Sequence, residues 1–216
     1  MTTTPKLTLH GFFRSSCSWR VRIALAHKGV AHEYRPVDLL AGEQHRAPFV
    51  EKNPIHQVPL LEIEEHGTVW RLGQSLAILE WLEERFPAPP LLPRDPRARA
   101  KARQLAELVN SSIQPFQNLI VLSRVEALGG RRAAWARSFI EPGLVALDRE
   151  AESTAGRFLV GHEPSFADLC LVPQLDAARR YGVDVSAFPR LLRIEAACSE
   201  LPAFQVAHAD RQPDAR

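Results

Sequence analysis

Short apolar runs alternate with amphipathic stretches along the first 86 residues of the chain. Short apolar runs between polar or glycine positions are typical of strands, whereas apolar positions that recur every three or four residues are typical of helices. The expected strands are Leu7–Phe13, Glu33–Val37, Leu60–Ile63 and Thr68–Arg71, and the expected helices are Trp19–Lys28, a short one near Ala47–Lys52, and Ser75–Phe86. This order of elements predicts a small α/β domain.

The pattern changes at residues 87–96, where five of the ten residues are proline. Because proline has no N–H group and restricts the residue before it, this stretch predicts an extended connector. Beyond it, helical periodicity covers the segments Arg97–Leu128, Arg131–Ser153, Phe166–Tyr181 and Phe188–Leu201. We therefore expect a thioredoxin-like α/β domain at residues 1–86, a proline-rich linker at 87–96 and an all-α domain at 97–216.

Composition narrows the partners and the cellular setting. The 27 basic and 25 acidic residues give a net charge of +2, so no nucleic-acid partner is expected. No apolar run approaches the ~20 residues of a membrane span, and the first residues carry no signal-peptide pattern, so no membrane partner is expected. The chain has three cysteines, and an odd number cannot all pair in internal disulfides. This favours a reducing, cytoplasmic location. No metal site is predicted.

The stretch RSSCSWRVRIAL at residues 14–25 carries the most specific chemical information in the chain. It places Ser15, Ser16 and Cys17 where the first strand gives way to the first helix. The first turn of a helix offers unpaired backbone N–H groups and a partial positive charge. Polar side chains at that point suit an anion, and a thiolate above all.

Which sulfur reacts is open at this point. Cys17 could itself be a nucleophile of the thioredoxin type, since a helix N-terminus lowers a thiol pKa. That chemistry normally needs a resolving cysteine in C-x-x-C, and the fourth position here is Arg20. Cys17 could also be a plain packing residue. The interpretation we favour is an external thiol bound as its anion beside the serines and Cys17.

The segment NPIHQVPLL at residues 53–61 suggests how such a ligand is held. Proline at the start of a strand suits a cis Val58-Pro59 bond, which would leave the Val58 N–H and carbonyl free to pair with an extended peptide. Gln74 and Ser75 open the next helix, where backbone N–H groups could bind a carboxylate. They could equally form an ordinary helix cap.

In the helical half, the sequence Ser165-Phe166-Ala167-Asp168 fits a capping box. We expect Asp168 to stabilise the start of a helix and not to act as a catalytic carboxylate.

Several of these motifs together resemble the zeta class of cytosolic glutathione transferases, over nearly the whole length of the chain. The motifs that carry the resemblance are FRSSCSWRVRIALAHKGV, NPIHQVP, GQSLAILEWLEERFP, IQPFQNL, FADLCLVPQ and AFQVAHADRQPD. The resemblance implies the architecture of these transferases and a homodimer. It implies a glutathione-dependent isomerase that converts maleylacetoacetate, a small dicarboxylate, to fumarylacetoacetate in tyrosine and phenylalanine breakdown.

The resemblance also implies the residues of the site. The catalytic candidates are Ser15, Ser16 and Cys17, with Ser15 as the principal donor to the thiolate. The residues expected to contact glutathione are Ser15, Ser16, Cys17, Ser18, Trp19, Arg20, Gln44, Val58, Gln74, Ser75, Gln114 and Asn118. Arg14 and Arg180 are the candidates for the substrate carboxylates, because a guanidinium group pairs with a carboxylate through two hydrogen bonds.

Other activities remain open. The same chemistry on maleylpyruvate is the nearest alternative, and Ser16-Cys17-Ser18-Trp19 favours maleylacetoacetate. Removal of halogen from α-halo acids and a non-catalytic glutathione-binding role are further alternatives. The sequence departs from the family pattern at Ile120, where a related enzyme has serine, and in the segment 65–73, which is a few residues longer than in that relative.

Overall fold

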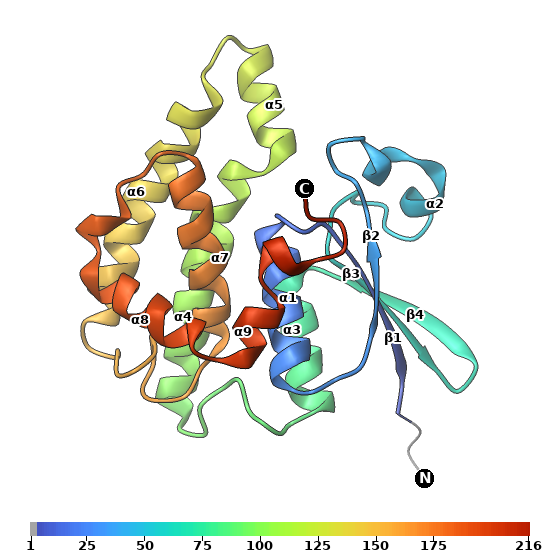
Figure 1. Cartoon of the computed structure of the whole chain (residues 1–216), viewed down its shortest axis with the longest axis horizontal. Coiled ribbons are helices and arrows are strands. Elements are labelled where there is room, and N and C mark those ends of the chain that lie inside the picture. The colour runs from blue at the N-terminus through green and yellow to red at the C-terminus, as the bar shows by residue number, and fades with distance from the viewer. Residues whose placement is uncertain (1–3) are drawn as a thin grey trace. The chain divides into compact units, whose positions relative to one another are not determined.

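The computed structural model describes residues 4–216, which form two compact units (Figure 1). Unit 1 comprises the chain up to Pro90 together with Pro202–Arg216, and unit 2 comprises Leu91–Leu201. Residues 202–216 were expected in the helical domain, but they belong to the α/β unit. No helix among the described residues is both long and apolar enough to span a membrane.

Unit 1 is built on a four-stranded sheet with the strand order β2-β1-β3-β4. Its strands are β1 (Lys6–Gly11), β2 (Glu33–Pro36), β3 (Leu60–Glu65) and β4 (Thr68–Gly73). β1 runs parallel to β2 and antiparallel to β3, and β3 and β4 form a hairpin. Leu7, Leu9, Leu61 and Ile63 are buried along the two central strands. The unit is a thioredoxin-like domain, as the order of apolar runs predicts.

Two longer helices contact each other beside this sheet, α1 (Ser16–His27) and α3 (Ser75–Arg85). The short elements η1 (Glu43–His45) and α2 (Ala47–Val50) lie on the opposite side of the sheet from them (Figure 1). α1 begins three residues earlier than expected, because the Ser15 side chain caps it by accepting from the Ser18 N–H.

The additional part of unit 1 is α9 (Pro202–Val206) with the turn η4 (Ala209–Arg211). α9 packs against α1, and Ala203 and Phe204 are buried. Arg22 of α1 donates from Nε to the carbonyl of Ala207 at 3.1 Å. Apolar burial and this hydrogen bond explain why the segment belongs to unit 1.

The proline-rich stretch is divided between the two units. Within unit 1, the buried Lys28 amine donates to the carbonyl oxygens of Phe86 and Pro89, at 2.7 and 3.0 Å. Within unit 2, Leu91 is buried and its carbonyl accepts from the Phe166 N–H. The proline-rich linker expected at 87–96 is therefore held to unit 1 near Pro89 and to unit 2 at Leu91.

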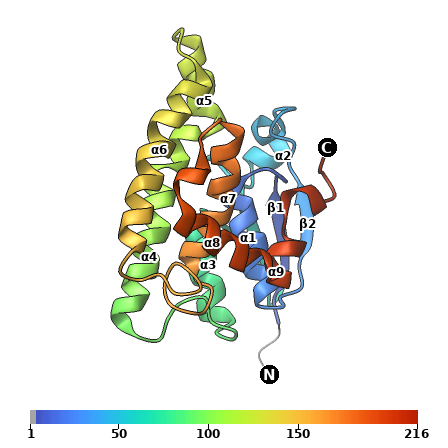
Figure 2. The same ribbon diagram turned by 60° about the vertical axis from the view of Figure 1, so that its left-hand side comes forward.

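Unit 2 is helical throughout its described elements, and α4, α6 and α7 run side by side in it (Figure 2). Its elements are α4 (Pro96–Ser112), η2 (Gln114–Gln117), α5 (Leu119–Ala127), α6 (Arg132–Ala151), α7 (Phe166–Arg180), η3 (Val185–Ala187) and α8 (Pro189–Ser199). The prediction of a single helix over 97–128 is wrong. The helix is interrupted near Pro115, because proline cannot donate a helical hydrogen bond. Asn118 then caps α5.

The start of α7 carries the expected capping box, which is confirmed. Asp168 accepts from both the N–H and the hydroxyl of Ser165, and from the Leu159 N–H at 2.8 Å. Complete burial raises the pKa of Asp168 to about 6, against the effect of these donors. Asp168 thus fixes the loop before α7 to the helix.

Candidate active site

The N-terminus of α1 presents unused hydrogen-bond donors. Ser15 accepts from the Ser18 N–H at 3.2 Å, which leaves its own O–H proton free to donate. Among residues 4–216, the N–H groups of Ser16 and Cys17 have no acceptor. Ser15 and Cys17 are partly exposed, so a ligand can reach this point. The donors fit an anion of the size of a thiolate.

The side chains of Ser16, Ser18 and Trp19, in the first turns of α1, are buried within unit 1. Ser18 and Trp19 are buried, and the Ser18 side chain lies 3.3 Å from where a Cβ on Gly11 would stand. The Trp19 ring packs edge-on against His208 at 4.9 Å between centroids. Ser16 is also largely buried. Packing is what the structure assigns to the side chains of Ser18 and Trp19, and their contact with a ligand stays a prediction.

Arg20 joins the starts of α1 and α3. Its side chain is completely buried, and NH1 donates to the Ser75 hydroxyl at 3.1 Å. Gln74, which precedes α3, has φ = 66° and an exposed side chain. A non-glycine residue in this backbone region is uncommon and is typical of functional sites. The first-turn N–H groups of α3, which have no partner inside the helix, thus begin at the residue that pairs with a buried guanidinium, and this arrangement suits a carboxylate.

The Val58-Pro59 bond is cis, as expected. Within the described part of the chain, neither the N–H nor the carbonyl oxygen of Val58 has a hydrogen-bond partner. The loop before it is held by Asn53, whose side chain donates to the Gln57 carbonyl at 2.7 Å. An extended peptide could thus pair with the Val58 backbone as a further strand.

Gln44 lies in η1, after β2. Its Nε2 donates to the Leu39 carbonyl at 3.5 Å, and its buried Oε1 has no partner among residues 4–216. Unpaired donors and acceptors at Ser16, Cys17, Val58 and Gln44 in one unit fit a peptide that carries a thiol and a carboxylate.

Known proteins similar to this chain include glutathione transferases, by name and by family. Residues 14–85 match the family model of the glutathione S-transferase N-terminal domain. A maleylacetoacetate isomerase of Rattus norvegicus is 48% identical over 211 residues, which cover 97% of this chain and 95% of the rat protein. A zeta-class glutathione S-transferase of Euphorbia esula is 46% identical and covers 97% of this chain and 93% of its own.

A crystal structure of maleylacetoacetate isomerase from Anaeromyxobacter dehalogenans 2CP-1, with glutathione bound in its active site, is 52% identical. It covers 100% of both chains with a TM-score of 0.92. The chain belongs to the zeta class of the glutathione S-transferase family. A second crystal structure of the same enzyme, at a TM-score of 0.91, holds dicarboxyethyl glutathione and citrate in the active site.

The transferase residues expected in unit 2 lie around η2 and at the end of α7. Gln114 is half-buried at the start of η2, and Asn118 accepts from the Ile120 N–H at 3.2 Å. Gln117 between them is buried and paired with Gln174 through both amide groups, which anchors η2 to α7.

Two arginines were expected to bind the substrate of this transferase. Arg14 is exposed, and its guanidinium lies 5.2 Å from the centre of the Phe13 ring. Arg180 pairs with Asp176 at 3.1 Å, four residues earlier on α7, and its side chain is 39% exposed. An exposed pair of this kind is weak, so Arg180 can exchange Asp176 for another carboxylate.

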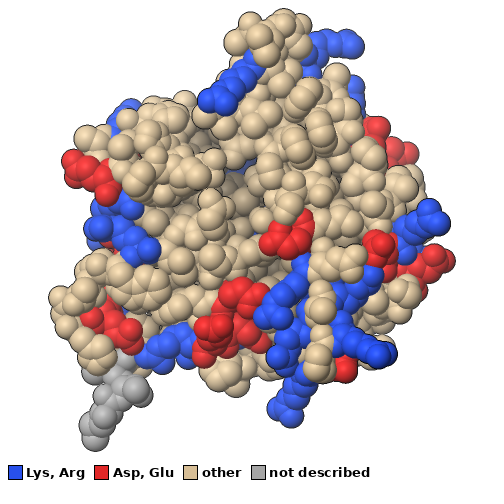
Figure 3. Space-filling view, turned by 180° about the vertical axis from the view of Figure 1, so that it is seen from behind, with Lys and Arg blue, Asp and Glu red and all other residues tan. Residues whose placement is uncertain are grey.

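Basic side chains are mixed with acidic ones over one face of the transferase, apart from one dense basic group at the lower right of Figure 3. Residues 4–216 contain no group of three or more His, Cys, Asp or Glu side chains that could hold a metal ion.

Two polar residues of the site region escaped the sequence analysis. Arg22 is buried, its NH2 donates to the Phe13 carbonyl at 2.9 Å, and burial lowers its pKa to about 10. Asp214 accepts from the Phe13 N–H at 2.9 Å. A charged residue on the apolar face of the first helix was the available signal for Arg22; nothing local pointed to Asp214.

Proposed function

We propose that this chain is a glutathione-dependent cis–trans isomerase that converts maleylacetoacetate to fumarylacetoacetate. The observation that carries the proposal is the set of unused donors at the start of α1, the Ser15 hydroxyl and the N–H groups of Ser16 and Cys17. The names of the similar proteins of rat and A. dehalogenans support the choice of substrate.

Glutathione, when bound, supplies a thiolate whose addition to the cis double bond allows rotation and whose loss restores a trans alkene. The chain must keep that sulfur ionised at neutral pH. Lowering a thiol pKa by two units corresponds to ~2.7 kcal/mol of differential stabilisation. Charge-assisted hydrogen bonds and a helix N-terminus are together sufficient for this.

Within this proposal, the Ser15 hydroxyl donates a hydrogen bond to the ionised sulfur, while Ser16 and Cys17 contribute backbone N–H groups. Gln74 and Ser75 hold a glutathione carboxylate at the start of α3, and Arg20 adds positive charge through Ser75.

The other proposed glutathione contacts are less specific. The Val58 backbone pairs with the peptide groups and Gln44 offers its unpaired Oε1. Ser18 and Trp19 contribute through the backbone geometry they fix. Gln114 and Asn118 remain proposed glutathione contacts of unit 2.

Arg14 and Arg180 are the proposed partners of the substrate carboxylates. The citrate and the dicarboxyethyl glutathione in the A. dehalogenans enzyme show that a relative binds such groups. Two further parts of the proposal, a homodimer and a cytoplasmic location, follow the pattern of the cytosolic transferases that the sequence resembles. Sedimentation at equilibrium tests the first: a mass of one chain would contradict it.

The decisive experiment compares substrates with the purified protein and glutathione. We expect a higher kcat/KM for maleylacetoacetate than for maleylpyruvate, and only slow release of halide from an α-halo acid. A higher value for maleylpyruvate would replace the proposed substrate. Retention on immobilised glutathione without turnover of any of these substrates would leave a binding protein.

A further inference from the structure

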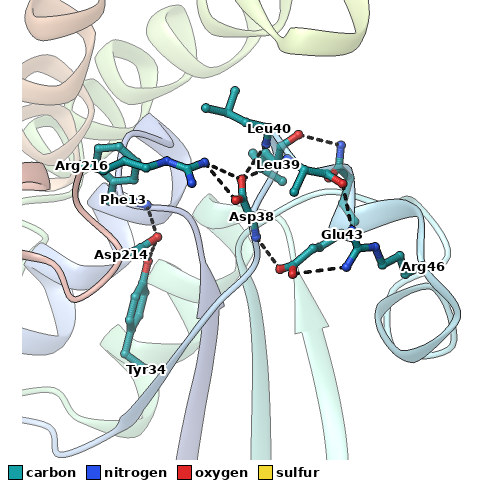
Figure 4. Close-up of polar contacts among 11 residues, drawn as sticks. Phe13, Tyr34, Asp38, Leu39, Leu40, Glu43, Arg46, Asp214 and Arg216 are labelled. Carbon is teal, nitrogen blue, oxygen red and sulfur yellow. Dashed lines mark hydrogen bonds and ion pairs between the residues drawn. The ribbon is translucent and has the colours of Figure 1, made fainter.

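Residues 207–216 run beside the loop that precedes α1 and the loop that follows β2 (Figure 4). Asp214 Oδ2 accepts from the Phe13 N–H at 2.9 Å and from the Tyr34 hydroxyl at 3.4 Å. Burial raises the pKa of Tyr34, so its hydroxyl stays protonated and remains a donor. Asp214 thus fixes one side of the Phe13 residue, two positions before Ser15.

The other side of Phe13 is fixed by Arg22. Its NH2 donates to the Phe13 carbonyl at 2.9 Å and its NH1 donates to the Phe12 carbonyl at 3.4 Å. The same Phe12 carbonyl accepts from the Ser15 N–H at 3.0 Å. The position of Ser15 therefore depends on a backbone that Asp214 and Arg22 hold from opposite sides.

Arg216 holds the second loop. Its NH2 lies 2.9 Å from both carboxylate oxygens of Asp38. Asp38 in turn accepts from the N–H groups of Leu40 and Ala41 and donates its own N–H to Glu43, within the loop that leads to Gln44 (Figure 4).

We propose that Asp214 and Arg216 are positioning residues for the glutathione site, with different effects. Asp214 acts through Phe13 on Ser15 and thereby on the pKa of the bound thiol. Arg216 acts through Asp38 on Gln44 and thereby on the affinity for glutathione. This inference rests on the glutathione contacts proposed above for Ser15 and Gln44.

The first test measures the pKa of the thiol of bound glutathione from the ultraviolet absorbance of its thiolate as pH is varied. Asp214→Ala should raise this pKa by about one unit, because Ser15 loses its fixed position. Asp214→Asn keeps an acceptor for the Phe13 N–H and should leave the pKa no higher than in the wild type. If Asp214 acted by its charge alone, both variants would lower the pKa.

Two variants control this measurement. Tyr34→Phe removes the second donor to Asp214 but keeps the bond to Phe13, so the thiol pKa should stay at the wild-type value. If Asp214→Ala does not fold, Asp214→Ser replaces it, because a serine hydroxyl is too short to reach the Phe13 N–H. An unchanged pKa in the folded Ala or Ser variant overturns the role of Asp214.

The second test measures glutathione binding by calorimetry. Arg216→Ala should weaken binding about threefold, as befits a partly exposed ion pair, without moving the thiol pKa. Arg211→Ala is the matched control, since the exposed Arg211 side chain has no hydrogen bond or ion pair within residues 4–216. Equal affinity in Arg216→Ala and Arg211→Ala overturns the role of Arg216.

Ser15→Ala distinguishes a failure of the proposed glutathione site from a failure of the positioning roles. A raised thiol pKa in Ser15→Ala, with an unchanged pKa in Asp214→Ala and an unchanged glutathione affinity in Arg216→Ala, would leave the proposed site intact and refute the positioning roles. An unchanged pKa in Ser15→Ala would refute the proposed site itself.

Discussion

At the residue scale, the chemistry proposed here depends on a hydroxyl and a thiol two positions apart. Ser15 precedes α1 and caps it, whereas Cys17 is the second residue of the helix. A serine hydroxyl donates a stronger hydrogen bond than a thiol, and the Ser15 hydroxyl proton has no acceptor within residues 4–216. The Cys17 side chain is therefore secondary to Ser15, although its backbone N–H belongs to the donor set.

Ser15→Ala should accordingly lower kcat/KM for the isomerisation by about 100-fold, the usual cost of losing a donor to a reacting anion. Cys17→Ala should lower it far less. Since Ser15→Ala also removes a cap worth about 1 kcal/mol, Ser15→Thr serves as the control that keeps both the cap and the donor. Steady-state kinetics with glutathione and maleylacetoacetate decides: equal turnover for wild type and Ser15→Ala would refute the role.

Features that depend on neighbouring residues are predictable from the sequence. The cis bond at Val58-Pro59 and the cap at Asp168 follow from neighbouring residues, and both are present. Asp214 is 201 positions away from Phe13, whose N–H it accepts. The residues around Phe13 in the sequence give no indication of a hydrogen-bond partner so far along the chain, so only the folded structure identifies it.

At the scale of elements, the short helix α2 depends on polar links to the sheet. Glu62 on β3 accepts from Lys52, just after α2, and from Arg71 on β4, at 2.7 and 3.1 Å. It also bonds His10 of β1. Burial alone would raise the pKa of Glu62, but hydrogen bonds from Lys52 and His10 outweigh it and lower the pKa to about 2.

This shift predicts a pH dependence of stability. Because the folded-state pKa lies below the ordinary 4.5, ionised Glu62 stabilises the fold above pH 4.5, and the contribution is lost as pH falls towards 2. Glu62→Gln should therefore be less stable than wild type by about 2 kcal/mol at pH 7. Urea unfolding should show that this difference shrinks between pH 5 and pH 3.

Glu64→Gln, on the same strand but half exposed, is the matched control and should change stability by less than about 0.5 kcal/mol. A difference between wild type and Glu62→Gln that stayed constant from pH 7 to pH 3 would contradict the assignment.

Elements were predictable where periodicity and capping agree. The four strands and α3 follow from the alternation of apolar runs. The break between α4 and α5 was not predicted, because the apolar positions keep helical spacing across it and mask the effect of Pro115. The short α9, which begins at Pro202 shortly after α8, was not predicted as a separate helix.

At the scale of the whole molecule, the sequence indicates two structural classes along the chain, but it does not show which unit each segment joins. Residues 202–216 follow the helices of unit 2, so sequence order alone assigned them to the helical domain. Their buried apolar side chains and the Arg22 hydrogen bond to Ala207 place them in unit 1. Such an assignment depends on packing, which a one-dimensional pattern does not contain.

The assignment of α9 to unit 1 can be tested with two substitutions in that helix. Phe204 is 4% exposed and Val206 is 54% exposed. Phe204→Ala should cost about 3 kcal/mol, the usual price of removing a buried ring, and should raise hydrogen exchange in α1, against which α9 packs. Val206→Ala should change neither. Faster exchange confined to α6, α7 and α8 in Phe204→Ala would return the segment to the helical domain, because the loss of packing would then lie in unit 2.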